Sequence, residues 1–158
     1  MSINGHYARL APTDLGRALA DPDVAEELTG HLAATGDRLH EVGPYWDAIA
    51  FLLRRHGFPV DLVDGGAELP GVPGLGYGPP RYLTPDQVRC VVGALDGISA
   101  DTLAEGLSGA ELTAAEVYPI GFWERDGALD SAVGAYQDLA RFLRTAARYR
   151  QAVLFWTA

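Results

Sequence analysis

The sequence has no lysine, and all 12 of its basic residues are arginines. A chain without lysine can neither form a Schiff base nor supply a P-loop lysine, so both chemistries are excluded. Its single cysteine excludes an internal disulfide. No apolar run approaches the roughly 20 residues that a membrane-spanning helix needs. Residues 1–6 lack the basic-then-apolar order of a signal peptide. We therefore expect a cytoplasmic protein that does not enter a membrane.

The residues that carry most enzyme chemistry are also sparse. The four histidines are not paired at the short spacings of zinc sites, and the chain has no Gly-x-Ser-x-Gly element. The one thiol, Cys90, falls inside a predicted helix among valines, so we expect it to be at least half-buried and unreactive. We predict no catalytic residue, no metal and no cofactor, and an enzyme is the less favoured hypothesis.

The charge of the chain is strongly acidic. A length of 158 residues suits one domain spanning residues 1–158. The formal charge of −9 argues against nucleic acid and anionic membranes as partners, because both need a basic surface. Four arginines gather near the C-terminus, at Arg141, Arg144, Arg148 and Arg150. They could hold a phosphate or an acidic partner, but a solvated helix face is the favoured interpretation.

The chain is organised around residues 71–85, which contain four glycines and four prolines. This loop has its path set by backbone constraints. It leads into a short predicted strand at residues 81–83. Thr84 then has the position of a helix N-cap, and Gln87 that of its partner in a capping box. Leu83 and Val88 complete a hydrophobic staple across the helix start.

The rest of the chain alternates between strand and helix patterns. Residues 152–156 are continuously apolar, which is typical of a strand covered on both faces and therefore central in a sheet. We expect Thr13 to cap the first helix and Asp21 to cap the second. Residues 61–63 are a connection or an edge strand. The other expected elements are a strand at 3–10 and helices at about 13–20, 22–35, 44–57, 85–96, 99–107, 108–117 and 130–150.

Residues 76–85 resemble the central motif of the YfbM-like proteins, a bacterial family of unknown function. The resemblance extends to Trp46 with the apolar residues 51–53, to Tyr118-Pro119 with Trp123, and to the last helix and strand. It implies a mixed α/β (α+β) fold, with a small central sheet flanked by six or seven helices, and no known activity. Relatives often carry histidines where this chain has Asp47 and Ala50, which lowers the expectation of an enzyme further.

The glycine loop and its arginine allow opposed interpretations. Alternating glycines at residues 74–78 suggest a phosphate loop, but a strand follows instead of a helix, so a close-packed turn is favoured. Arg81 lies between Tyr77 and Tyr82 and could bind an anion or a carboxylate. The favoured alternative is that Arg81 points inward and pairs with a distant acid, Asp47 or Glu124. Removing Arg81 would then lower stability by roughly 3 kcal/mol.

A second aromatic group lies at Tyr118, Phe122 and Trp123, followed by Glu124, and it has the composition of an exposed loop. Two functions remain open. The first is a non-catalytic binding or interaction module, such as an immunity-like protein that masks a protein partner with its acidic surface. The second is a small-ligand-binding protein or an enzyme, with a cleft around Arg81, Tyr77 and Trp123. A pocket with convergent polar groups is what the second function requires.

Overall fold

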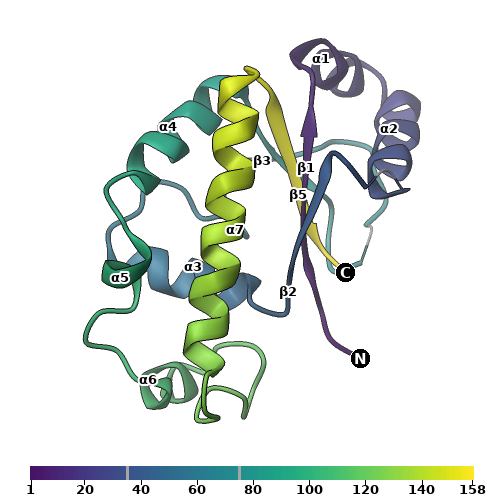
Figure 1. Cartoon of the computed structure of the whole chain (residues 1–158). Coiled ribbons are helices and arrows are strands. Elements are labelled where there is room, and N and C mark those ends of the chain that lie inside the picture. The colour runs from purple at the N-terminus through teal and green to yellow at the C-terminus, as the bar shows by residue number, and fades with distance from the viewer. Residues whose placement is uncertain (35, 75) are drawn as a thin grey trace.

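The computed structural model describes residues 1–34, 36–74 and 76–158, and within them the chain forms a mixed α+β fold around one antiparallel sheet (Figure 1). Its strand order is β2-β1-β5-β4-β3. Three of the strands were expected, and the predicted central position of the last strand is confirmed. The strands are β1 (Gly5–Leu10), β2 (Leu39–Gly43), β3 (Ala67–Glu68), β4 (Arg81–Leu83) and β5 (Ala152–Thr157).

Seven helices in the described residues surround this sheet on both faces. The longest, α7, runs alongside the strands, while α1 and α2 lie on the opposite side (Figure 1). The expectation of six or seven helices is therefore confirmed. The helices are α1 (Pro12–Ala20), α2 (Pro22–Ala34), α3 (Trp46–Arg55), α4 (Pro85–Leu95), α5 (Ala100–Leu103), α6 (Gly109–Ala114) and α7 (Ala128–Arg148).

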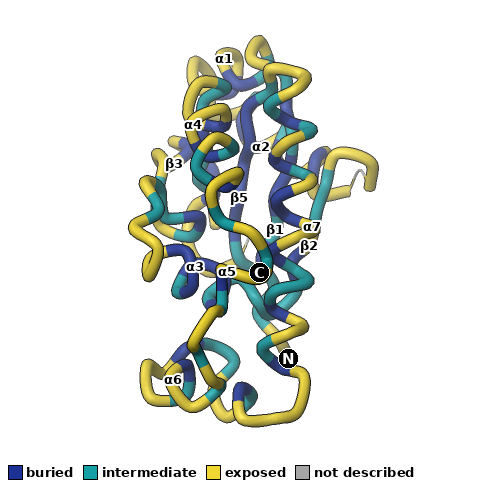
Figure 2. Tube along the Cα trace, turned by 60° about the vertical axis from the view of Figure 1, so that its left-hand side comes forward, coloured by how far each residue is buried: buried dark blue, intermediate teal, exposed yellow. Residues whose placement is uncertain are grey.

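Strand β5 divides the core into two layers because its alternate side chains point to opposite faces. Val153 and Phe155 pack with α3, α4 and α7, whereas Leu154 and Trp156 pack against α1 and α2. Figure 2 shows β5 as a continuous buried stretch at the centre of the sheet, with exposed residues on the outer turns of the helices. A continuous apolar run is thus explained by burial on both faces.

Three local expectations were wrong. Strand β2 was not predicted, because an edge strand with His40 and Glu41 lacks a clean apolar alternation. Helix α1 begins two residues earlier than a Thr13 cap implies, with Ala11 as its N-cap, so Thr13 lies inside the helix and caps nothing. Helix α3 begins at Trp46 and not at residue 44, because residues 44–45 form the turn that connects β2 to the helix.

The cap of α4 is present as predicted. The Thr84 hydroxyl accepts from the Gln87 amide at 3.3 Å, and the Gln87 side chain accepts from the Thr84 amide at 2.9 Å. We expect Thr84→Ala to lower the free energy of unfolding by about 1 kcal/mol, since a helix N-terminal amide loses its acceptor. Urea denaturation measures this, with the exposed, non-capping Thr13→Ala as matched control. Equal losses in the two variants would contradict the prediction.

The expected burial of Cys90 was wrong, while its lack of reactivity stays a prediction. Helix α4 turns Val88, Val91 and Leu95 into the core, and Cys90 lies on the solvent face between them. Helical spacing accounts for the difference. Val88 and Val91 are three positions apart and share one face of the helix, whereas position 90 lies beside that face.

None of the helices in the described part of the chain is both long and apolar enough to cross a membrane.

Candidate functional site

A pocket of about 190 Å³ opens on the face of the sheet that α3 and α7 cover, where β5 ends. We call it the Tyr7 pocket. Tyr7 of β1 and Phe155 of β5 line it with rings stacked 5.9 Å apart. Trp46, at the start of α3, lines it as well, and the loops at residues 62–64 and 77–79 complete its lining. The pocket is therefore assembled from segments far apart in the sequence.

One wall of the pocket is a loop at residues 61–65 that Asp61 holds in place. Its carboxylate accepts from the amides of Val63 and Asp64, at 2.8 and 3.0 Å, and from the guanidinium of Arg54 at 2.9 Å. The backbone carbonyl of Asp61 also accepts from the Gly65 amide at 2.9 Å. This one residue therefore fixes the loop that presents Leu62, Val63 and Asp64 to the pocket.

Titration behaviour follows from these contacts. Burial by itself would raise the pKa of Asp61, but the amides of Asp64 and Val63 and the guanidinium of Arg54 outweigh it, so the pKa lies below the ordinary value of 3.8. Burial, with the nearby Asp61 carboxylate, raises the pKa of Tyr7. The Tyr7 phenol therefore stays protonated and donates to the Leu62 carbonyl at 2.9 Å. This hydrogen bond connects strand β1 to the loop at residues 61–65.

The lowered pKa of Asp61 predicts a pH-dependent contribution to stability. A carboxylate with a depressed folded-state pKa stabilises the fold above its unfolded-state pKa and loses that effect as pH falls through the folded-state pKa. We expect the free energy of unfolding of wild type to exceed that of Asp61→Asn by about 2 kcal/mol at pH 7. The neutral asparagine oxygen accepts from the Val63 and Asp64 amides more weakly than the carboxylate does, and the half-exposed Arg54 adds less. Urea melts should show the gap closing below about pH 4. A gap that is equal at pH 7 and pH 3 would contradict this account.

The rim of the pocket is formed by residues 77–79 of the glycine loop, which lie beside the end of β5. The Tyr77 amide donates to the Thr157 carbonyl at 3.0 Å. A Cβ on Gly76 would lie 2.5 Å from that same oxygen, so only glycine allows this approach. The side chain of Tyr77 is 69% exposed at the mouth of the pocket. The close-packed turn, rather than a phosphate loop, accounts for these contacts.

Arg81 lines the pocket but does not have the partner that we expected. Its Nη1 lies 3.2 Å from Oε1 of Glu68, and its Nε donates to the Gly65 carbonyl at 2.8 Å. Both Asp47 and Glu124 were wrong as partners. Glu68 lies directly opposite Arg81 in the β3–β4 pair, and a register neighbour is closer than any distant acid.

The expected effect of removing Arg81 is correspondingly smaller. Glu68 is 62% exposed, so Arg81→Ala leaves it hydrated rather than stranded in the core. We expect a loss of about 1 kcal/mol, mainly from the bonds to the carbonyls of Gly65 and Gly66. Thermal or urea unfolding measures it, with Glu68→Ala as the control that removes only the ion pair. A loss of roughly 3 kcal/mol would instead indicate a buried pair.

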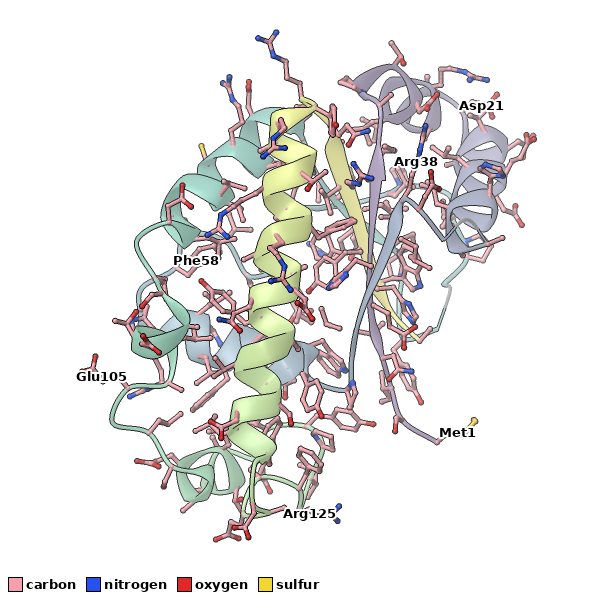
Figure 3. The ribbon with its side chains drawn as sticks, viewed as in Figure 1. Met1, Asp21, Arg38, Phe58, Glu105 and Arg125 are labelled. Carbon is pink, nitrogen blue, oxygen red and sulfur yellow. The ribbon has the colours of Figure 1, made fainter. Side chains whose placement is uncertain are left out.

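The second aromatic group lies elsewhere, around α6 and the loop before α7. Trp123 is 2% exposed and donates to the Val117 carbonyl at 2.9 Å, so its expected exposure was wrong. Its indole is large and apolar, and burial beneath Phe122 and Tyr45 explains the difference. Glu124 lines a separate hollow on this side. Figure 3 shows the neighbouring Arg125 pointing outward from this end of the molecule.

Two further candidates act as structural contacts. Asp47 accepts from the Tyr118 amide at 2.9 Å. The Tyr118 hydroxyl accepts from the Ile3 amide at 2.7 Å, and its ring stacks on Trp46 at 5.6 Å. Tyr118 therefore supports the pocket from behind Trp46.

Tyr82 packs in the core layer of α1 and α2, because neighbouring strand residues point to opposite faces, and it is not a lining residue of the Tyr7 pocket.

Sequence reasoning missed Tyr7, Asp64 and Glu68 as pocket residues. Tyr7 was hidden in a strand weakened by Gly5, and the other two lie in a segment without periodicity. The available signal was the alternation of β1 and β5, which turns Tyr7, Phe155 and Thr157 to one face.

The chemical groups at the pocket suit binding. No cysteine, histidine or serine occurs among the described residues that line it. Over residues 1–34, 36–74 and 76–158, no three metal-ligating side chains come together. On the last helix, Arg141 pairs with Asp138 and Arg144 with Asp96, which is the behaviour of a solvated helix face.

Comparison with known proteins supports the fold and the family. None of the curated proteins matches the chain. A solved structure titled as a protein of unknown function, YfbM from Escherichia coli, has the same fold, with a TM-score of 0.66. It is 16% identical, and the match covers 98% of this chain and 99% of that one. The family model described as a domain of unknown function, DUF1877, matches residues 1–156, and the chain belongs to this family.

Proposed function

We propose that the chain is a non-catalytic binding protein that receives a single side chain of a protein partner in the Tyr7 pocket. The observation that carries this proposal is the size of the pocket. Pockets that enclose drug-sized ligands measure about 300–1,000 Å³. At about 190 Å³ the Tyr7 pocket suits a group the size of one side chain.

The rim of the pocket supports a protein partner. Tyr77 stands at its mouth with most of its ring in solvent, and Trp46 and Arg81 line the interior. Tyrosine, tryptophan and arginine around a pocket are the residues that dominate protein–protein hot spots. The backbone of Tyr77 is also held in place, because its amide donates to the Thr157 carbonyl, which lowers the entropy that this residue loses on binding.

The acidic charge agrees with such a role. At −9 the chain attracts a basic partner and repels acidic ones. An immunity-like protein, which masks a basic partner by covering its surface, is the form of this function that the charge favours.

A small-ligand-binding protein is the second candidate, favoured by the convergence of Arg81 and Glu68 beside the aromatic rings. The version with Trp123 in the cleft is not proposed, because that side chain is buried in a different cluster. An enzyme is the less favoured form of this candidate. The acid–base groups in the lining are the carboxylates of Asp64 and Glu68, and Glu68 already accepts from Arg81.

Affinity capture with three baits tests the proposal. Thr157 lines the pocket, so Thr157→Trp adds an indole to its lining from the end of β5. Tyr149→Trp is the matched control, because Tyr149 is 63% exposed and is not one of the residues that line the pocket. We expect wild type and the control to capture the same protein from a lysate of the source organism, and Thr157→Trp to lose it. Equal capture by all three baits would contradict the proposal.

A further inference from the structure

The charges at the Tyr7 pocket specify what kind of side chain fits it. Three ionised groups line it, Asp64, Glu68 and Arg81, so the site carries one net negative charge. The carboxylate of Asp64 has no partner among the contacts of the described residues, and only its amide is engaged, with Asp61. The free charge of the pocket is therefore an acid.

An incoming anion would have to compete for Arg81. Each of its three nitrogens already donates within the protein, to the Gly65 carbonyl at 2.8 Å, to Glu68 at 3.2 Å and to the Gly66 carbonyl at 3.4 Å. An anionic ligand would also share the pocket with the carboxylates of Glu68 and Asp64. Like-charge approach of this kind is unfavourable.

The aromatic lining favours a cation for a separate reason. Five aromatic residues line this small pocket: Tyr7, Trp46, Tyr77, Phe155 and Trp156. The face of an aromatic ring carries negative electrostatic potential and attracts ammonium and guanidinium groups, and tryptophan does so most strongly. A planar guanidinium can stack on a ring and still direct its fork at a carboxylate.

We propose that the side chain received by the Tyr7 pocket is cationic, an arginine of the partner whose guanidinium stacks on the aromatic lining and pairs with Asp64. This inference rests on the proposed function and adds the chemical class of the ligand. Glu68 keeps Arg81 neutralised, so the arginine of the protein does not repel the arginine of the partner. The charge of −9 over the whole chain adds attraction at longer range.

A titration with blocked amino acids tests the inference. The probes are the N-acetyl, N-methylamide derivatives of arginine, glutamine and glutamate, which share one frame and differ in charge. The indole N–H signal of Trp46 reports the pocket by NMR, and that of Trp123, which lies in another cluster, is the internal reference. We expect only the arginine probe to move the Trp46 signal, with the Trp123 signal unmoved.

Variants assign the effect to the free carboxylate. Asp64→Asn should lower the affinity for the arginine probe roughly fivefold, as expected for loss of one partly solvated charge pair. Asp126→Asn is the control with the same change in charge, since Asp126 lines the separate hollow beside Glu124, and it should change affinity less than about twofold.

Three results would overturn the inference: tighter binding of the glutamate or glutamine probe, equal weakening by both variants, or no movement of Trp46 with the arginine probe. If a neutral or acidic probe moves Trp46, the pocket still binds a side chain and the proposed function stands without its cationic preference. The proposed function itself fails on the capture experiment, which uses no probe.

Discussion

Replacing Trp123 by alanine should lower the free energy of unfolding by about 4 kcal/mol. The indole is 2% exposed, packs edge-on against Phe122 at 5.2 Å and donates to the Val117 carbonyl. Truncation therefore removes aromatic packing, opens a cavity and leaves a buried carbonyl without its donor. Chemical denaturation measures the loss directly.

The control for this prediction lies in the same loop. Ile120 is 72% exposed, so Ile120→Ala should change stability by less than about 0.5 kcal/mol. A Trp123→Ala protein as stable as Ile120→Ala would mean that the indole is not buried, and the expectation of an exposed aromatic loop would be restored.

Replacing Gly65 by alanine should lower stability by about 3 kcal/mol. An added Cβ would lie 2.1 Å from the carbonyl oxygen of Asp61, and that oxygen also accepts from the Gly65 amide. Because the nearest atoms to this Cβ are backbone atoms of Asp61, no side chain can move aside to relieve the clash. The loop at residues 61–65 must shift as a unit, and the wall of the Tyr7 pocket shifts with it.

A glycine in open space provides the comparison for Gly65. Gly93 is an exposed glycine within helix α4, and no atom lies within 4 Å of a Cβ placed there. Gly93→Ala should therefore raise stability by about 1 kcal/mol, as helix propensity predicts. A Gly65→Ala variant that is as stable as wild type, or more stable, would show that the crowding at Gly65 is absent in solution.

Local sequence signals predicted the parts of the fold that depend on short-range chemistry. The Thr84–Gln87 box is complete within four residues, so its spacing alone specifies the helix start. The apolar run of β5 predicted a central strand because only burial on both faces suits it. Neither inference needed to know what lies across the sheet.

The remaining features depend on tertiary contacts that the sequence does not display. Arg81 pairs with Glu68 because β3 and β4 lie in register, and a strand of two residues has no periodicity to reveal that register. Cys90 is exposed although its helix turns Val88, Val91 and Leu95 into the core, because position 90 lies beside that buried stripe. The Tyr7 pocket joins β1, α3, β5 and two loops, and no motif marks such a combination.

The most direct test of the Tyr7 pocket as the binding site is site-specific photocrosslinking in the source organism. Benzoylphenylalanine would replace Tyr77 at the mouth of the pocket in one variant and Tyr149 in another, two tyrosines of similar exposure. We predict that position 77 yields one discrete protein adduct, that position 149 does not yield it, and that adding Thr157→Trp abolishes it. The same adduct from both positions, or an adduct at position 77 that survives Thr157→Trp, would contradict the account.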